Sequence, residues 1–457
     1  MGAIEEAIAG GELRTGQRLP SIRQGAERWG VSRNSVVEAY DRLVAAGLVE
    51  SVPGSGFYVS RPERTIRHVE PLPRESSEID AVAMLRSGMT RDWMRPRPGW
   101  GGLPTDWMDE AAIRKAVREL ANDRGRTNLV EYGHPAGLPG LRIQLHRELA
   151  RLDIHAEPGQ IVTTVGASQA LDLVCRVLLR PGDTVLVDDP GYYTLFAQLR
   201  TAGISVVGVP RGPGPLDTTL VEGLIQAHRP VAYFTNSVMH NPTGTSLSPA
   251  CAHRLLTIAD RHQLLLVEDD VYGDLHPSQP LRLAALGDWK GIIYIGSFSK
   301  TLSSALRVGY LVAEPALASR LMDFKMLTAV STSALPEAVI LRLLESGHYR
   351  RFLSSLRARL DRTRGRLLAR LEAIGLRAPD DQGAGMYLWA ELPDGMDAAS
   401  VADEARERGV MLAPGNIFRP NGEASAHLRF NVACSDHPEV YRVLHEILRP
   451  RTRRPRR

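Results

Sequence analysis

The chain has only four lysines, and one of them has neighbours that suit amine chemistry. They are Lys115, Lys290, Lys300 and Lys325, and every other residue among the 56 basic ones is an arginine. A lysine amine can form a Schiff base with a carbonyl group, whereas an arginine stays protonated and cannot. Lys300 follows an apolar run, 292–296, and ligands bind at the carboxyl ends of strands in α/β folds. Lys300 is therefore the best candidate for a nucleophilic amine.

The other three lysines have poorer surroundings. Lys115 lies among Ala, Arg and Glu on an amphipathic stretch, and Lys290 lies in a polar turn, so we expect both to be solvated. Lys325 is less clear, but its predicted helix has no phosphate-binding neighbours.

Residues near the candidate lysine and on a second segment suit a phosphorylated aldehyde. Ser297 and Ser299 offer hydroxyl donors, and Arg307 offers a guanidinium that can bind a phosphate through two parallel hydrogen bonds. The stretch 166–169 follows an apolar run and opens a predicted helix, whose N-terminus favours an anion. Its backbone amides and Ser168 can hold a phosphate.

An acidic cluster, Glu268-Asp269-Asp270, ends another apolar run, 264–269. One buried carboxylate there can keep a pyridine nitrogen protonated, which makes the ring an electron sink. A helix cap and a metal site are the alternatives for this cluster. No histidine pair with ligand spacing supports a metal.

Residues 1–60 predict a helix-turn-helix followed by a strand–turn–strand wing. The first residues of a recognition helix point at base edges in the major groove, where Arg33 suits guanine or a phosphate and Asn34 suits adenine or the DNA backbone. The residues suited to the DNA backbone are Ser32 and Ser35 at the start of that helix, Arg23 on the preceding helix, and Gly54 in the wing turn. Any small helical bundle with a hairpin is the alternative on pattern alone.

These groups need elements to position them, and the rest of the chain supplies an alternating pattern. Six apolar runs, at 161–165, 184–188, 204–209, 231–235, 264–269 and 292–296, are separated by helical segments. That pattern predicts an α/β domain with a mainly parallel sheet. A long Arg/Leu helix at 347–374 and short strands near 386–391 and 427–432 predict a smaller C-terminal α+β lobe.

The predicted organisation has four parts. A winged helix-turn-helix spans 1–60, and a linker rich in Arg, Pro, Glu and Ser spans 61–95. The α/β domain spans 96–450, and a basic tail spans 451–457.

Composition excludes several classes of protein. The 457 residues are 43 % hydrophobic and 24 % charged, as in a soluble globular protein, and no run of about 18 apolar residues predicts a membrane helix. The start of the chain lacks the pattern of a signal peptide, and three scattered cysteines predict no disulfide framework. We therefore expect a cytoplasmic protein.

Net charge does not argue for DNA binding. The chain carries +4, but residues 449–457 alone hold six arginines and no acid. Such a tail is more often a solvated end than a binding element.

The head carries a family resemblance. The pattern from Gly11-Glu12-Leu13 to Phe57-Tyr58-Val59, including LPSIR and GVSRN, is similar to the winged-helix head of the GntR family of bacterial regulators. The resemblance implies double-stranded DNA contacts at Arg23, Ser32, Arg33, Asn34, Ser35 and Gly54. One departure is Val37, which takes the place of a second basic residue found in some members, so base-specific contacts depend more on Arg33.

The body resembles the fold-type I aminotransferases. It carries Asn241-Pro242-Thr243-Gly244, Asp269-x-x-Tyr272, Ser297-x-Ser299-Lys300 and Arg307-x-Gly309 in the family's order, and the resemblance covers about 96–450. It implies pyridoxal 5′-phosphate as the cofactor and a site that forms across a homodimer interface.

The resemblance also implies a role for each matching residue. Lys300 forms the internal aldimine, and Asp269 pairs with the pyridine nitrogen. Tyr192 stacks on the ring, with Tyr193 as a rival, and Asn241 and Tyr272 bond the phenolic oxygen. Ser168, Gln169, Ser297 and Arg307 bind the phosphate, Tyr132 reaches a phosphate in the partner subunit, and Arg429 clamps the carboxylate of a substrate or effector.

A GntR-like head on an aminotransferase-like body is the arrangement of the MocR subfamily. It implies a transcriptional regulator that senses pyridoxal phosphate, or an amino compound, through aldimine chemistry at Lys300. A working aminotransferase with a DNA-binding head is the main alternative, because all catalytic positions are present. A pyridoxal phosphate lyase or decarboxylase is a third interpretation.

Overall fold

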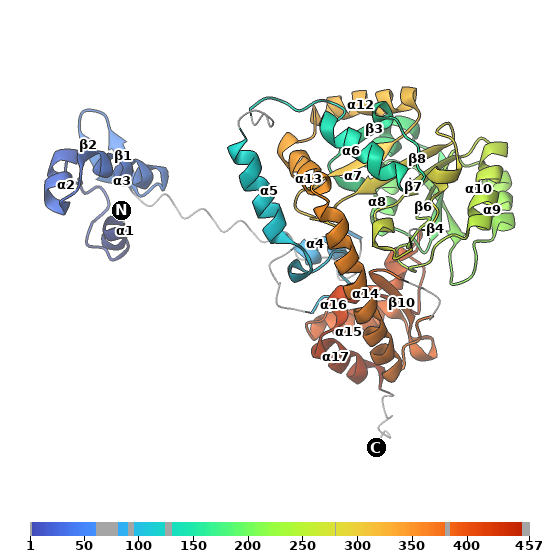
Figure 1. Ribbon diagram of the computed structural model, residues 1–457. Coiled ribbons are helices and arrows are strands. Elements are labelled where there is room, and N and C mark those ends of the chain that lie inside the picture. Colours follow the sequence, from blue (N-terminus) through green and yellow to red (C-terminus); the bar gives the residue numbers. More distant parts are fainter. Residues whose placement is uncertain are drawn as a thin grey trace, which may run out of the picture. The chain divides into compact units, whose positions relative to one another are not determined.

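The computed structural model describes residues 2–60, 81–89, 96–123, 130–278, 280–379 and 384–449. The chain falls into two compact units, Met1–Ser77 and Glu78–Arg457 (Figure 1). No helix in the described ranges is long and apolar enough to cross a membrane. The predicted tail, 451–457, and most of the predicted linker lie outside those ranges.

The N-terminal unit has three helices and a two-stranded hairpin: α1 (Gly2–Ala9), α2 (Ile22–Trp29), α3 (Arg33–Ala45), β1 (Val49–Val52) and β2 (Gly56–Val59). Ser21 and Gln24 form a reciprocal cap at the start of α2, and Gly30 ends it with φ +64°. The Ser32 hydroxyl then accepts the Ser35 amide at 3.1 Å and starts α3. These caps create the helix-turn-helix that the sequence predicts.

Tyr40 lies at the centre of this unit's core. Its ring is fully buried and lies 4.8 Å from the Phe57 ring, and its hydroxyl donates to the Pro20 carbonyl at 2.8 Å. Val36 and Leu43 occupy the same buried face of α3. The opposite face of α3, which begins with Arg33 and Asn34, is therefore left to solvent.

The second unit is built around a seven-stranded sheet. Its strand order is β3-β9-β8-β7-β6-β4-β5, and every neighbouring pair is parallel except those that involve β9. The strands are β3 (Ile161–Thr164), β4 (Thr184–Asp189), β5 (Ser205–Pro210), β6 (Ala232–Thr235), β7 (Leu265–Asp269), β8 (Ile292–Ser297) and β9 (Gly309–Val312). The sequence predicts the six parallel strands to within about a residue but misses β9, a short strand without a preceding helix.

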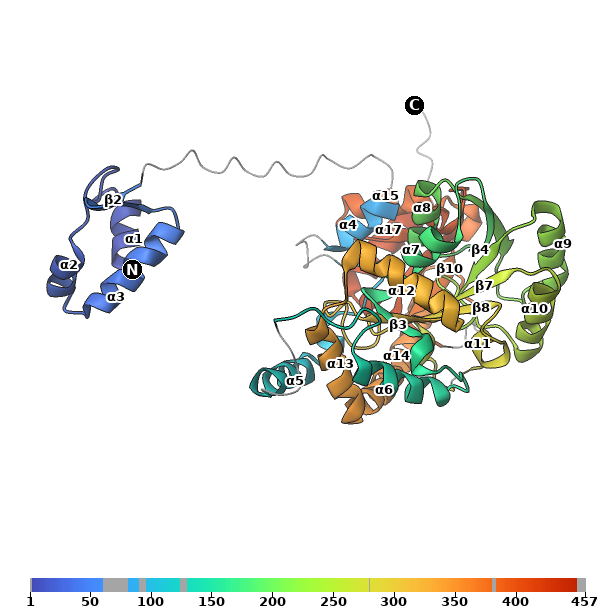
Figure 2. The same ribbon diagram turned by 90° about the horizontal axis from the view of Figure 1, so that it is seen from above.

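Helices cover both faces of this sheet, as Figure 2 shows. One face packs against α7 (Gly166–Leu178), α8 (Tyr193–Thr201) and α12 (Pro315–Ala329). The other packs against α6 (Pro139–Ala150), α9 (Thr218–His228), α10 (Pro249–Arg261), α11 (Leu283–Leu286) and α13 (Ala334–Glu345). With both faces covered, the strands are apolar along their length, which explains the uninterrupted apolar runs.

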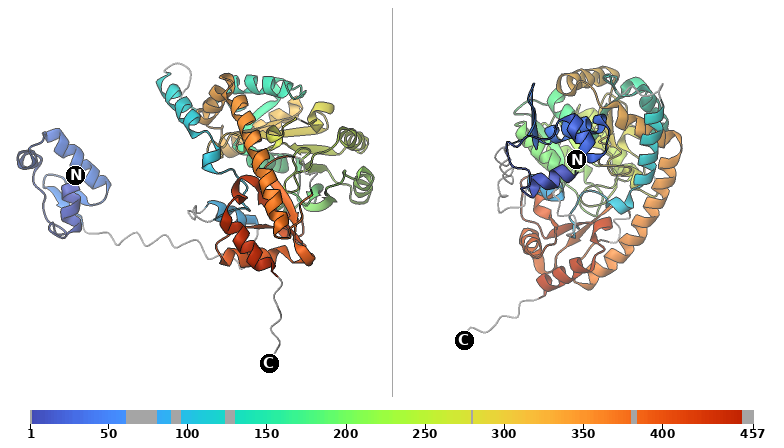
Figure 3. Two further views of the ribbon diagram at one scale, coloured as in Figure 1. Left: turned by 60° about the horizontal axis from the view of Figure 1, so that its bottom comes forward. Right: turned by 90° about the vertical axis from the view of Figure 1, so that its left-hand side faces the viewer.

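The C-terminal lobe is smaller and is joined to the sheet by one long helix, α14 (His348–Ala373). Figure 3 shows α14, in orange, running along the unit to the red C-terminal elements. The lobe holds a three-stranded antiparallel sheet, β10-β12-β11, with β10 (Tyr387–Glu391), β11 (Ala413–Pro414) and β12 (His427–Asn431). Its helices are α15 (Ala398–Glu407), α16 (Val432–Ser435) and α17 (Pro438–Leu448).

Two further helices of the second unit come before α6 in the chain. They are α4 (Ala81–Met89), which lies within the predicted linker 61–95, and α5 (Glu110–Asn122). Met84 of α4 is buried in a cluster with Tyr193, Trp389 and Phe418. This part of the predicted linker therefore folds against the aminotransferase-like unit.

Candidate functional sites

Several predicted site residues follow the strands of the large sheet at one edge. Parallel strands place their carboxyl ends together, so Asp269 at the end of β7 and Lys300 just after β8 lie side by side with the loop after β6 that carries Asn241. Arg307 and the start of β9 reach the same edge because β9 runs antiparallel to β8.

Lys300 is half-buried and is surrounded by polar groups. Its Nζ donates to the carbonyl of Gly101 at 2.7 Å. Burial lowers the pKa of Lys300 to about 8, Arg429 and Arg307 add to that fall, and the carboxylate of Asp269 opposes it. A substantial fraction of neutral amine is therefore available near neutral pH, as a nucleophile requires.

Asp269 presents an unused acceptor in the same place. Its Oδ1 is buried and has no hydrogen-bond partner within the described residues. The pKa of Asp269 is raised to about 7, mainly by burial and also by the neighbouring carboxylate of Asp270. A buried carboxyl oxygen without a donor is costly, so it suits a ligand that brings a protonated nitrogen. This is the feature that fits a pyridoxal ring.

The other two acids of the cluster have structural partners. Glu268 accepts the amides of Leu283 and Ala284 and so caps α11, while Asp270 accepts from Arg282 at 2.9 Å and from Tyr294 at 2.7 Å. The helix cap that the sequence left open is therefore found at Glu268. Asp270 keeps one buried oxygen without a partner in the described ranges, but its other oxygen is held by Arg282 and Tyr294, and Asp269 is the acid that lies beside Lys300.

The predicted phosphate residues converge at the N-terminus of α7. The Arg307 guanidinium donates to the Ser299 hydroxyl at 3.3 Å and to the Val165 carbonyl at 3.1 Å. Ser297 bonds Ser299 through their hydroxyls at 3.1 Å. A Cβ on Gly166 would lie 2.6 Å from an Arg307 nitrogen, so glycine is required for this close approach. Hydroxyls, a guanidinium and a helix N-terminus together suit a phosphate dianion.

Two further predicted phosphate ligands lie in the first turn of α7. Ser168 and Gln169 are both half-buried there. The Gln169 side-chain oxygen accepts the Val165 amide at 2.7 Å, so this side chain also caps the helix.

Asn241 links the large lobe to the small one. Its Oδ1 accepts from Arg429 Nη1 at 2.9 Å, and its Nδ2 lies 3.3 Å from the Tyr272 hydroxyl. The Tyr272 hydroxyl is in turn 3.4 Å from that of Tyr387 on β10. Sequence reasoning missed Tyr387; the signal was its place in a predicted strand, but only pairing of β10 with β12 brings it beside Arg429.

Arg429 is almost fully buried. Its guanidinium lies 4.3 Å from the Tyr387 ring centre and 4.8 Å from that of Phe418. Its Nη2 donates to the Gly99 carbonyl at 2.7 Å. A guanidinium beside Lys300 suits the carboxylate of an amino compound.

The two adjacent tyrosines have different surroundings. Tyr192 lines a small cavity together with Asn236 and Asp269, the place where a ring partner is needed. Tyr193 instead packs edge-on to Phe418, with ring centres 5.4 Å apart. Burial raises the pKa of the Tyr193 hydroxyl, and neighbouring Arg429 opposes that rise.

Tyr132 is not brought into this group within one chain. It is 83 % exposed. The segment that follows it is anchored by the Leu138 amide, which donates to Glu337 at 2.5 Å. Its expected role in a partner subunit stays a prediction.

The predicted DNA-contacting residues are all exposed. Ser32, Arg33, Asn34 and Ser35 are all exposed at the start of α3. Arg23 on α2 is 76 % exposed at its side chain and pairs with Glu27 at 3.2 Å. Gly54 turns the hairpin with φ +73°.

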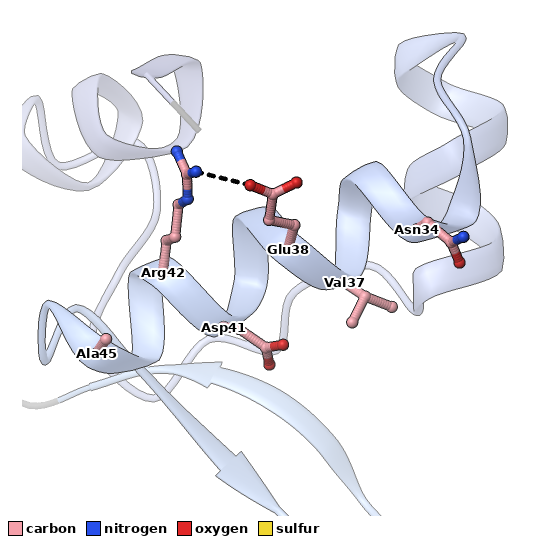
Figure 4. A pocket seen from close by; sticks show the side chains of 6 residues that line it. All are labelled: Asn34, Val37, Glu38, Asp41, Arg42 and Ala45. Atoms are coloured by element: carbon pink, nitrogen blue, oxygen red, sulfur yellow. Dashed lines mark hydrogen bonds and ion pairs between the residues drawn. The ribbon is translucent and has the colours of Figure 1, made fainter. Parts of the chain in front are cut away.

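A shallow groove runs along α3 from Asn34 in its first turn to Ala45 at its end (Figure 4). Its lining residues are Asn34, Val37, Glu38, Asp41, Arg42 and Ala45. Arg42 donates to Glu38 at 2.6 Å, so its charge is compensated. The two acids would repel phosphates, which leaves the first turn of α3 as the part suited to a DNA groove.

Two family models match the chain. "Bacterial regulatory proteins, gntR family" matches residues 1–59, and "Aminotransferase class I and II" matches residues 103–447. The second model alone covers well over half of the sequence.

The individual relatives are likewise of two kinds, transcriptional regulators and aminotransferases. The uncharacterized HTH-type transcriptional regulator YcxD of Bacillus subtilis is 31 % identical over 425 residues, 90 % of this chain and 89 % of that protein. The 2-aminoadipate transaminase of Thermus thermophilus is 31 % identical over 354 residues, 74 % of this chain and 86 % of that protein. The crystal structure of LysN, an α-aminoadipate aminotransferase of Thermus thermophilus complexed with N-(5′-phosphopyridoxyl)-L-leucine, matches with a TM-score of 0.73, 26 % identity, and coverage of 82 % of this chain and 95 % of that one.

Proposed function

The chain belongs to the MocR type of transcriptional regulators, a GntR-family winged helix joined to an aminotransferase class I and II domain, and from this premise we propose that it binds operator DNA as a homodimer under control of an amino-compound effector. Its cofactor is pyridoxal phosphate. One observation carries the proposal: a single chain holds an exposed recognition helix and a half-buried lysine beside an acceptor and a phosphate cradle.

Pyridoxal phosphate, when bound, supplies an aldehyde that reacts with primary amines and a ring that delocalises negative charge. We assign its attachment to Lys300 and the ring nitrogen to Asp269. We assign the phosphate to Ser168, Gln169, Ser297 and Arg307, the ring face to Tyr192, and the phenolic oxygen to Asn241 and Tyr272. Tyr132 would add a phosphate contact from the partner subunit.

The effector should carry an amine and a carboxylate. The amine would act at Lys300, and the carboxylate would bind Arg429, whose guanidinium is buried beside it. An effector that binds only one conformation of the body shifts the protein toward that conformation.

A homodimer is supported by exposed apolar side chains. Val130 and Tyr132 are 94 % and 83 % exposed, and Leu327 is 83 % exposed near the end of α12. A Cβ on Gly133 would lie 3.0 Å from the Thr332 carbonyl, so the two stretches are neighbours. Monomeric proteins rarely expose such apolar clusters, and a second copy would cover this one.

Two copies of the winged helix would then read two half-sites in the cytoplasm. We assign base contacts to Arg33 and Asn34, and backbone contacts to Arg23, Ser32, Ser35 and Gly54. Loss of a good bidentate base contact costs about 1–3 kcal/mol.

The decisive experiment measures binding of the purified chain to the DNA upstream of its own gene, with nonspecific competitor at fixed salt. We expect one fragment to bind tightly and Arg33→Ala to weaken that complex about 10- to 100-fold. Glu38→Gln, on the same helix but beyond its first turn, is the matched control and should not weaken it. Equal binding to all fragments would count against the regulator.

A working aminotransferase is a second candidate, because the 31 % identical transaminase relative covers most of this unit. Lys300, with a pKa lowered to about 8, can also accept and donate a proton near neutral pH. Repeated turnover of an amino acid with a 2-oxo acid would support it. A single stoichiometric half-reaction would not.

A further inference from the structure

A glycine-rich segment, residues 96–102, crosses the site between Lys300 and Arg429. Its backbone carbonyls face the site: Gly101 accepts from Lys300 and from the Tyr387 hydroxyl at 2.9 Å, and Gly99 accepts from Arg429 Nη2 at 2.7 Å. None of the motifs in the sequence includes this segment.

Asn431 holds the segment in place. It is fully buried on β12, two residues beyond Arg429. Its Nδ2 donates to the carbonyls of Trp100 at 2.8 Å and Gly102 at 2.6 Å, and its amide donates to the Pro98 carbonyl at 2.6 Å. One asparagine thus makes hydrogen bonds to three residues within the five-residue stretch 98–102, and two of them, Pro98 and Trp100, flank Gly99.

The Gly99 carbonyl accepts a hydrogen bond from a nitrogen of Arg429, Nη2, that an incoming carboxylate would also use. Arg429 Nη1 is already bonded to Asn241, and its Nε is buried without a hydrogen-bond partner among the described residues. Nε and Nη2 are the side of a guanidinium that binds a carboxylate through two parallel hydrogen bonds. Nη2 carries two N–H groups, so such a carboxylate would share this nitrogen with the Gly99 carbonyl, whose oxygen would repel it at close range.

The segment is also tied to α4. The Arg97 guanidinium donates to the Gly88 carbonyl at 2.9 Å, and a Cβ on Gly88 would lie 1.7 Å from the Trp100 ring. Met84 of α4 is buried with Phe418, whose ring contacts Arg429. Displacement of Gly99 would disturb the contacts that seat α4, which is the described element that follows the winged helix in the chain.

We propose that Asn431 is a positioning residue that holds the 96–102 segment against Arg429, so that the Gly99 carbonyl competes with the carboxylate of an effector for Nη2. This rests on the proposed function, in which Arg429 binds the effector carboxylate. The segment is then an internal competitor for carboxylates but not for amines.

Glycine and methylamine test this directly, because they differ only in the carboxylate. Their affinities for the full chain loaded with pyridoxal phosphate are measured from the absorption change of the cofactor. Asn431→Ala removes two hydrogen bonds to the segment and should tighten glycine binding roughly three- to tenfold while leaving methylamine unchanged. Asn421→Ala makes the same chemical change at an exposed position of the same lobe and should leave both affinities unchanged.

Gly99→Ala is the second variant, since its Cβ would lie 2.5 Å from backbone atoms of Leu412 and Ala413 and would force the segment to shift. Like Asn431→Ala, this variant should raise the affinity for glycine relative to the affinity for methylamine. Hydrogen exchange of the Gly99 and Asn431 amides, both bonded between segment and lobe, should rise with glycine and not with methylamine.

The outcomes separate the two proposals. If neither probe alters the cofactor spectrum of the parent chain, the amino-compound effector itself is wrong. If the parent binds both probes but both variants leave the ratio unchanged, or weaken both probes equally, the role of Asn431 is wrong and the proposed function stands.

Discussion

Lys300 and Lys325 lie in the same unit, and burial lowers the pKa of each to about 8. Lys325, on α12, donates to the Thr163 carbonyl at 2.8 Å, with the carboxylate of Glu337 nearby. That carboxylate is itself satisfied, by the Leu138 amide and the Thr332 hydroxyl.

The surroundings of Lys300 are of another kind. Asp269 there has a buried oxygen without a donor in the described chain, and Arg307 gathers hydroxyls at a helix N-terminus. A shifted pKa therefore marks burial, whereas polar groups that still lack partners mark a ligand. We expect four measurements to separate the two lysines.

The largest effect is expected from Lys300→Ala. This variant should lose all borohydride-trappable pyridoxal phosphate, because its amine is the proposed point of attachment. Lys325→Met should keep full occupancy, as judged by the mass of the trapped protein. Stoichiometric trapping of the cofactor on one residue of Lys300→Ala would contradict the assignment.

Lys325→Met should instead lower the free energy of unfolding by about 2 kcal/mol, because it removes a charged hydrogen bond from a buried carbonyl. Urea unfolding of the cofactor-free chain measures this change. The exposed Lys290→Met is the control and should have almost no effect. Equal free energies of unfolding for Lys325→Met and Lys290→Met would contradict this prediction.

Asp269→Asn should raise the dissociation constant of pyridoxal phosphate roughly 10- to 100-fold, the worth of a hydrogen bond to a charged group. Equilibrium dialysis provides the measurement. Asp361→Asn, at an exposed position of α14, should bind as the parent does. Unchanged affinity in Asp269→Asn would remove the main reason for placing the pyridine ring there.

The smallest effect concerns pH. The pKa of Lys300 is lowered to about 8, so its neutral fraction rises as pH increases through 8. Attachment of pyridoxal phosphate to the cofactor-free chain should therefore accelerate about tenfold from pH 7 to pH 9 and then level off. A rate that still rises beyond pH 10 would show a lysine with its ordinary pKa.

Much of this architecture could be predicted from sequence because its signals are local. The helix cap at Ser32, the buried parallel strands, and the stretch from Ser297 to Lys300 are all indicated by neighbouring residues. Nothing local shows that Lys325 is buried, since it sits in a helix of ordinary composition.

The missed features depend on residues far apart in the chain. Tyr387 reaches the site only through the pairing of β10 with β12. The glycines at 99 and 101 bring backbone carbonyls, whose positions no side-chain pattern reveals. The roles of Glu268 and Asp270 could be separated from that of Asp269 only once their partners were known.

The scarcity of lysine gives the protein chemical selectivity. Pyridoxal phosphate is a free aldehyde that condenses with any accessible neutral amine, yet residues 1–60 contain no lysine and the body exposes only Lys115 and Lys290 among its four. Arginine supplies the same positive charge without this reactivity. The DNA-binding surface thus keeps its charge when the aldehyde is abundant, and acetylation of lysine side chains cannot remove it.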